Sequence, residues 1–97
     1  MKHVVVIATL TLKNTDAEVG FKDLQILHKA THHEDKGCLQ YDLHKDTEKE
    51  NTYVFVETWE SEALLAEHMG KAHFKAFQVA LDGKVESRSI QKLEKIL

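Results

Sequence analysis

The stretch Tyr53–His73 reads YVFVETWESEALLAEHMGKAH, and it contains the clearest change from strand to helix in the chain. Its first seven residues alternate, as in a strand whose neighbouring side chains point to opposite faces. Phe55, Glu57 and Trp59 then share one face with Tyr53, and the intervening valines share the other. The pattern leaves open which of these two faces meets the helices.

A helical region is predicted directly after this strand, at about 61–82. Ser61 is a good N-cap, and Leu65 and His68 recur at helical spacing. Gly70 is predicted to end the first helical segment as a left-handed residue, and a second segment follows it. The corner between strand and helix therefore brings a carboxylate, an indole and imidazoles close together.

The residues before this stretch predict a strand, a helix and a second strand. Residues 3–12 form an apolar strand whose first half is hydrophobic on both faces. Thr15 and Glu18 match a capping box, and apolar residues at steps of three and four predict a helix at about 16–33. Gly37 is expected to take a positive φ angle, and residues 38–44 alternate as the next strand.

The order of elements predicts a ferredoxin-like α+β fold in one domain that spans residues 1–97. The strand at 52–59 forms a hairpin with the one at 38–44, and residues 86–95 are expected to form the last strand. The resulting β-α-β-β-α-β pattern is typical of a four-stranded antiparallel sheet with two helices on one face. Because strands one and three carry aliphatic residues on both faces, we expect a second copy to cover the other face.

Composition excludes several classes of partner. Of the 97 residues, 42% are hydrophobic and 30% charged, which is typical of a globular chain. A net charge of −3 argues against nucleic acid and anionic membranes, which require a basic face. No apolar run reaches the roughly 20 residues that a membrane helix needs. The single cysteine excludes an internal disulfide and favours a cytoplasmic location.

Seven histidines are the unusual feature of the composition. His68 and His73 flank Gly70, and a pocket wall of Trp59 and the aromatic residues of the second helical segment is expected beside them. A histidine in such a pocket can act as a general base, because its ordinary pKa of about 6.5 lies near neutral pH. The alternative is that His68 is a helix residue at the rim of the core.

The other candidate residues carry weaker signals. Glu57 lies between two aromatic residues, so it must be paired or solvated, and structural and chemical roles are equally supported. His28 and His32 have the i, i+4 spacing of two metal ligands, but no third ligand is indicated and we expect no metal site. Cys38 has acidic neighbours, so we do not expect a nucleophile there. GxGxxG, P-loop, GxSxG and CxxC motifs are absent from the sequence.

Four segments together resemble the antibiotic biosynthesis monooxygenase (ABM) domain, in particular its small quinol monooxygenase members. The similarity covers nearly the whole chain and is carried by GCLQYDLHKD, FVETWES, LAEH and AHFKAF, at residues 37–46, 55–61, 65–68 and 72–77.

The resemblance implies a dimeric α+β barrel with a pocket between helices and sheet in each subunit. It also implies oxygenation of a small quinol or other enolisable substrate by dioxygen, with no flavin, haem or metal cofactor. By position, His68 is the expected base or hydrogen-bond partner of the substrate oxygen, and from its place in the strand Glu57 is the second expected catalytic residue. The expected substrate-binding residues are Trp59, His73, Phe74, His28 and Phe77.

Other functions stay open within the same family. Haem-degrading members differ at the positions that match Leu10, His68 and Gln78. Another branch isomerises a phosphorylated sugar, and here Arg88 is the sole arginine, with no evident phosphate cradle. An isomerase or proton-transfer enzyme would need the base but no dioxygen, and a dimer that only binds a small ligand would need neither.

Overall fold

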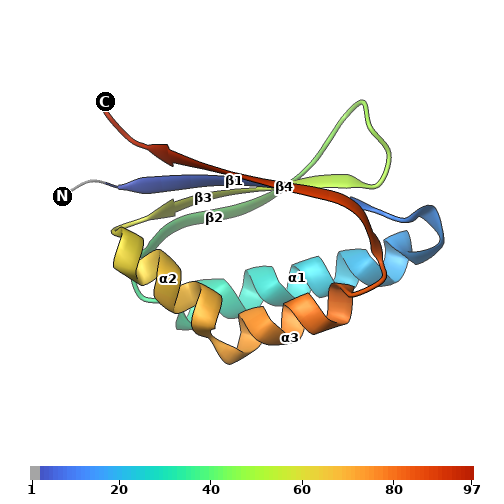
Figure 1. Ribbon diagram of the computed structural model, residues 1–97, viewed down its shortest axis with the longest axis horizontal. Coiled ribbons are helices and arrows are strands. Elements are labelled where there is room, and N and C mark those ends of the chain that lie inside the picture. The colour runs from blue at the N-terminus through green and yellow to red at the C-terminus, as the bar shows by residue number, and fades with distance from the viewer. Residues whose placement is uncertain (1–2) are drawn as a thin grey trace.

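The computed structural model describes residues 3–97 as one four-stranded antiparallel sheet with helices on one face (Figure 1). The strand order is β2-β3-β1-β4, and every neighbouring pair is antiparallel. This is the predicted ferredoxin-like α+β fold. In chain order the elements are β1 (Val4–Leu12), a short 3-10 turn (Asn14–Asp16), α1 (Ala17–Glu34), β2 (Cys38–Lys45), β3 (Thr52–Trp59), α2 (Glu62–Gly70), α3 (Ala72–Leu81) and β4 (Val85–Glu94).

The second helical region is two helices rather than one, so three helices cover the sheet. The break is a single extended residue, Lys71, with φ −70° and ψ 152°. Its N–H donates to His68 O, and its carbonyl accepts from the backbone N–H groups of Phe74 and Lys75. Lys71 thus ends α2 and begins α3. Gly70 is the last residue of α2 and has no positive φ, so the expected left-handed cap at Gly70 is wrong.

Of the two predicted helix N-caps, the one before α2 forms and the one before α1 does not. Ser61 caps α2, and its hydroxyl accepts a hydrogen bond from Leu64 N at 3.2 Å. The capping box predicted before α1 does not form. There the chain makes a 3-10 turn, Asp16 occupies the N-cap without a side-chain cap bond, and the Thr15 hydroxyl lies 3.4 Å from the Asp16 carboxylate.

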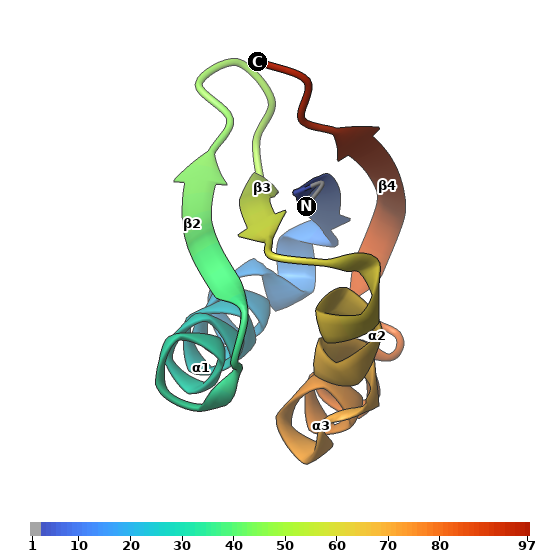
Figure 2. The same ribbon diagram turned by 90° about the vertical axis from the view of Figure 1, so that its left-hand side faces the viewer.

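β3 presents its aromatic face to the helices, which settles the orientation that the alternation left open. Phe55, Glu57 and Trp59 are buried on this face, and Trp59 is 0% exposed. In Figure 2, α1 lies on the side of β2, while α2 and α3 lie on the side of β4. Each large apolar side chain buried between these layers contributes roughly 1.5–3 kcal/mol to folding. The core consists of Val4, Val6, Leu10, Leu12, Leu24, Leu27, Tyr41, Phe55, Trp59, Leu65 and Leu81.

The opposite face of the sheet carries no helix (Figures 1 and 2). Strand pairing places Val5 opposite Thr58 and Leu93, and Ile7 opposite Val56. These aliphatic residues are half-buried or exposed, with Leu93 43% exposed. Within residues 3–97, no helix has the length and apolar character to cross a membrane.

Candidate active site

A mostly apolar cavity of about 220 Å³ lies between the sheet and the pair of helices α2 and α3. Its wall includes side chains from β1, β3 and β4 as well as from all three helices. Two aromatic side chains of α3, Phe74 and Phe77, line it, and their ring centroids are 6.1 Å apart. The polar groups on the wall include Tyr41, Glu57, His68, Gln78, Arg88 and Lys92.

His68 lies in the last turn of α2, where it is 2% exposed and packed between aromatic rings. Its imidazole lies over Trp59 with ring centroids 4.6 Å apart and meets the edge of Phe74 at 5.0 Å. Nδ1 is hydrogen-bonded to Asp35 Oδ2, whereas Nε2 is buried and has no hydrogen-bond partner among residues 3–97. A carboxylate can only accept here, so it favours the tautomer with the proton on Nδ1 and leaves Nε2 with a free lone pair.

Two effects act in opposite directions on the pKa of His68. Burial lowers the pKa because a charged imidazolium loses hydration, and the hydrogen bond to Asp35 raises it by less. The net result is a pKa below the ordinary value of 6.5. At neutral pH the imidazole is therefore uncharged and able to accept a proton.

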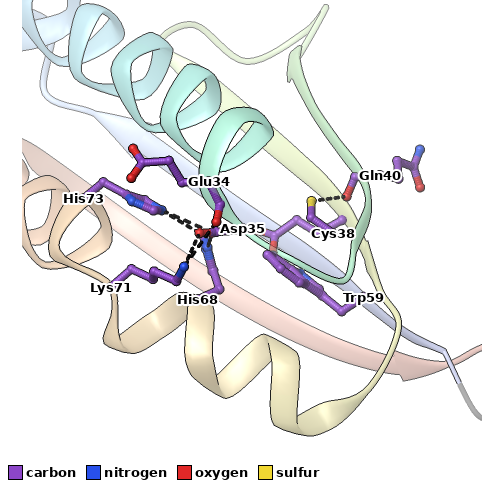
Figure 3. Close-up of polar contacts among 9 residues, drawn as sticks. Glu34, Asp35, Cys38, Gln40, Trp59, His68, Lys71 and His73 are labelled. Carbon is purple, nitrogen blue, oxygen red and sulfur yellow. Dashed lines mark hydrogen bonds and ion pairs between the residues drawn. The ribbon is translucent and has the colours of Figure 1, made fainter.

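Asp35 is the residue of this site that sequence reasoning missed. It is the C-cap of α1, its N–H donates to Thr31 O at 3.2 Å, and its side chain is 1% exposed. Figure 3 shows its carboxylate at the centre of three contacts. His68 is one; His73 Nε2 lies 3.0 Å from Oδ1, and Lys71 Nζ lies 3.8 Å from the same oxygen. A faint signal existed, because an acid at the carboxyl end of a helix opposes the helix dipole.

Asp35, His68 and His73 are also the chemical types that bind transition metals, and their donor atoms lie within 4.8 Å of one another. The ammonium of Lys71 beside Asp35 opposes a further cation. The carboxylate is already hydrogen-bonded to both imidazoles, so the arrangement is best suited to holding and orienting protons.

Glu57 is the second titratable group on the cavity wall. Its carboxylate is buried and accepts a hydrogen bond from the Trp59 indole N–H at 2.9 Å. Burial raises the pKa of Glu57 to about 7, and the indole hydrogen bond only partly opposes this. Near neutral pH Glu57 can therefore exchange a proton, which suits a role as acid or base.

Four of the five expected substrate-binding residues divide into two groups. Phe74 and Phe77 line the cavity together with His68 and Glu57. Trp59 and His73 do not line it. Trp59 contacts the cavity residues Glu57 and His68, and His73 contacts Asp35.

His28 needs correction as a residue of this pocket. It lies on the other side of α1, where it borders a shallow hollow with Phe21 and Leu43. Its ring is 4.4 Å from that of His32, and burial and the neighbouring imidazole lower the pKa of His28. His32 Nε2 is engaged with the Tyr41 carbonyl at 2.7 Å. The i, i+4 spacing correctly predicts that these two imidazoles lie on the same side of one helix. It cannot predict whether that side faces the cavity.

Cys38 has the character of an unreactive thiol. Its sulfur lies 3.6 Å from Gln40 O. Burial, followed by the negative charges of Asp35 and Glu57, raises the pKa of Cys38 to about 11. The thiolate required for nucleophilic attack is therefore scarce at neutral pH.

Comparison with known proteins agrees with this architecture. Among solved structures, the chain is similar to PA3566 from Pseudomonas aeruginosa, with a TM-score of 0.91 and 29% identity over 100% of this chain and 97% of that one. It is also similar to a protein of Caulobacter crescentus CB15 described as a putative antibiotic biosynthesis monooxygenase. There the TM-score is 0.92 and the identity 26%, over 98% of this chain and 91% of that one.

Sequence comparison gives the same relationship. A segment of 43 residues is 42% identical to "Putative monooxygenase YcnE" of Bacillus subtilis (strain 168). That segment covers 44% of this chain and 45% of the relative, so less than half of each protein is aligned. The sequence profile described as antibiotic biosynthesis monooxygenase matches residues 3–80. The chain therefore belongs to the antibiotic biosynthesis monooxygenase family.

Proposed function

We propose that this protein is a cofactor-independent monooxygenase that acts on a small quinol or similarly enolisable aromatic substrate. The observation that carries the proposal is the arrangement of His68. One ring nitrogen is fixed by Asp35, while the other is buried and unpartnered on an imidazole that lines an apolar cavity. Family membership supports the oxygenase class, since the Bacillus subtilis relative is named "Putative monooxygenase YcnE" and the Caulobacter crescentus protein is described as a putative antibiotic biosynthesis monooxygenase.

The proposed reaction begins with proton transfer. His68 Nε2 accepts a proton from a substrate hydroxyl, and the resulting electron-rich anion reacts directly with dioxygen. For a hydroquinone, one oxygen atom of O2 enters the ring and the other leaves as water. The four electrons all come from the substrate, which ends as a hydroxyquinone, so no external reductant is needed.

The other residues have supporting roles in this proposal. Glu57, with a pKa of about 7, can return a proton to the reduced oxygen or accept a hydrogen bond from a second hydroxyl. Phe74 and Phe77 supply flat apolar surface for an aromatic ring, and a bound ring would displace water from this wall. His73 and Trp59 position Asp35, Glu57 and His68 rather than contact the substrate.

Oxygen uptake tests the proposal. We expect purified protein to consume dioxygen with one or more members of a hydroquinone panel at a rate above the protein-free blank. His68→Gln should lower kcat by about 10²–10⁴-fold, the usual contribution of a general base. His28→Gln is the matched control, because it removes an imidazole outside the cavity, and it should leave kcat unchanged. Uptake equal to the blank for every substrate, or an unaffected His68→Gln variant, would overturn the proposal.

A proton-transfer enzyme or isomerase is the second candidate, and the observation that favours it is the pairing of His68 with Glu57 on one wall. A buried base and an acid that titrates near neutral pH can move a proton between two atoms of a substrate without dioxygen. Deuterium exchange from solvent into candidate enols under anaerobic conditions, with no oxygen uptake in air, would favour this function. Tight ligand binding with neither activity would favour a binding protein.

We also propose that the active form is a homodimer, located in the cytoplasm. The sheet face opposite the helices carries Val5, Ile7, Val54, Val56 and Leu93, which a second copy would cover by two-fold packing of sheet on sheet. A lone thiol suits a reducing compartment.

A further inference from the structure

Two cationic side chains of the edge strand β4 line the cavity, and their environments differ. Lys92 Nζ is hydrogen-bonded to Glu62 Oε1 at the start of α2, so its charge is compensated. Arg88 is an exposed residue, and its side chain makes no hydrogen bond or ion pair with any other residue in the described part of the chain. It is the single arginine of the sequence, and it lies on the wall of a cavity that is largely apolar.

Strand register places Arg88 and the acid–base groups at different ends of this cavity. Lys92 and Glu57 both pair with Val6 of β1, whereas Arg88 pairs with Leu10, four residues further along the strand. At about 3.4 Å per residue, Val6 and Leu10 are roughly 14 Å apart along β1, so Glu57 and Arg88 are at least as far apart at the backbone. Glu57 is therefore not a close partner that neutralises Arg88. The end of α3 leads through a short turn into the start of β4 (Figure 1). Gln78 of α3 and Arg88 of β4 both line the cavity.

The charge of Arg88 then predicts the kind of group that binds beside it. The whole chain carries a net charge of −3, so an uncompensated cation on a cavity wall is a local exception that attracts anions. A guanidinium presents paired N–H donors that match the two oxygens of a carboxylate.

We propose that the cavity selects a substrate with an anionic substituent, most simply an aromatic carboxylate, which Arg88 binds at the end of the cavity away from His68. The reacting hydroxyl would then lie between His68 and Glu57, a placement that rests on the function proposed above. Arg88 is in this view the residue that determines specificity, and the aromatic walls formed by Phe74 and Phe77 hold the ring between the two polar ends.

Anaerobic calorimetric binding of two matched ligands tests this proposal. The ligands are 2,5-dihydroxybenzoate and its neutral isostere 2,5-dihydroxybenzamide, which differ in charge but little in shape. We expect the wild-type protein to bind the carboxylate roughly tenfold more tightly or better, since a hydrogen bond to a charged group is worth about one power of ten or more. Arg88→Gln should abolish the preference, and Arg88→Lys should retain part of it. Lys75→Gln removes the same charge from an exposed position of α3 outside the cavity, and it should keep the preference intact.

The outcomes separate this proposal from the one on catalysis. Equal binding of the two ligands by the wild type, binding of neither, or an undiminished preference in Arg88→Gln would overturn the anion site. A carboxylate preference that depends on Arg88, in a protein that shows no oxygen uptake, would support the anion site and overturn only the oxygenase. Circular dichroism of each variant shows whether the fold is retained.

Discussion

The two nitrogens of the His68 imidazole have different surroundings. Nδ1 is hydrogen-bonded to a carboxylate that is itself 1% exposed, and Nε2 has no hydrogen-bond partner among residues 3–97. Such an arrangement fixes the tautomer and the ring orientation, and the partner carboxylate stabilises the imidazolium that forms when a proton is taken up. Burial lowers the pKa, so the base is available at neutral pH without prior deprotonation.

The role of Asp35 can be tested by Asp35→Ala. We expect kcat to fall by about 100-fold or more with KM little changed, because the imidazole loses its orientation and its fixed tautomer. Loss of the hydrogen bond that raises the pKa of His68 should also move the acid limb of the pH–rate profile to lower pH. Glu34→Ala, which removes the neighbouring exposed acid, is the control. An unchanged kcat and an unchanged acid limb in Asp35→Ala would show that the carboxylate is only structural.

Glu57 gives a prediction about stability and pH. Its pKa is raised by burial from 4.5 to about 7, so the folded state holds this proton more tightly than the unfolded state does. The stability that the proton provides is complete below pH 4.5 and is lost as the pH rises through 7. The loss is roughly 3 kcal/mol at about 1.4 kcal/mol per pKa unit.

The stability contributed by the Glu57 proton can be measured by urea unfolding of the wild type and of Glu57→Gln. The two proteins are compared at a fixed protein concentration and at pH values between 4.5 and 8. The difference in free energy of unfolding should change with pH in favour of the variant as the pH rises. A difference that is independent of pH would mean that Glu57 titrates normally.

The connection between α1 and β2 is the element that brings Asp35 to His68. Gly37 has φ +79°, and its carbonyl accepts a hydrogen bond from Glu60 N at 2.8 Å, which ties this connection to the end of β3. A Cβ at Gly37 would lie 2.3 Å from Leu64 Cδ1. The backbone conformation and the close approach of α2 therefore both require glycine at this position.

Three glycine-to-alanine variants should have different effects on the free energy of unfolding. Gly83 also has φ +79° but nothing near its missing Cβ, so Gly83→Ala should cost about 1–2 kcal/mol from backbone strain alone. Gly37→Ala should cost about 1–3 kcal/mol more because Leu64 must move. Gly70 is helical and open to solvent, so Gly70→Ala should stabilise by about 0.5–1 kcal/mol. Urea unfolding gives the order, and a destabilised Gly70→Ala would contradict the helical assignment of that residue.

At the scale of the whole molecule, the three helices cover one face of the sheet and leave aliphatic residues on the other. Proteins rarely leave a large contiguous apolar patch open to water, so a second copy packed face to face is the simplest cover. Pairing the sheets in this way leaves the cavity of each subunit on the helix side of its own sheet.

The dimer proposal predicts a change of mass with a single substitution. Ile7 pairs with Val56 on the uncovered face, so Ile7→Lys would bury a charge at the centre of the interface. Size-exclusion chromatography with light scattering should give a dimer for the wild type and a monomer for Ile7→Lys. Ile26→Lys is the control, because Ile26 lies on α1 and is already 65% exposed. A monomeric wild type would contradict the proposed assembly.

The fold could be predicted because it follows from periodicity. Alternation in Tyr53–Trp59 and apolar steps of three and four before Gly37 are local patterns, and the order of elements then limits the topology to a few choices. The break between α2 and α3 was less predictable. It depends on a single extended lysine whose conformation is fixed by hydrogen bonds to both helices, whereas the sequence predicts a left-handed residue at Gly70.

The site could be predicted only where its members belong to one continuous pattern. Glu57, His68, Phe74 and Phe77 follow one another along a strand and two helices, and the structure places all four on the cavity wall. Asp35 was missed because it reaches His68 from 33 residues away, through a connection that sequence alone marks only as a break.

The most direct test is the protonation pattern of His68 itself, observed without any substrate. Long-range proton–nitrogen NMR of histidine-labelled protein at pH 7, assigned by comparison with His68→Gln, reports which ring nitrogen carries hydrogen. We expect a neutral ring with the proton on Nδ1 and an unprotonated Nε2, and we expect this pattern to be lost in Asp35→Ala. A proton on Nε2, or a fully protonated ring at pH 7, would contradict the claim that His68 is a buried, available base.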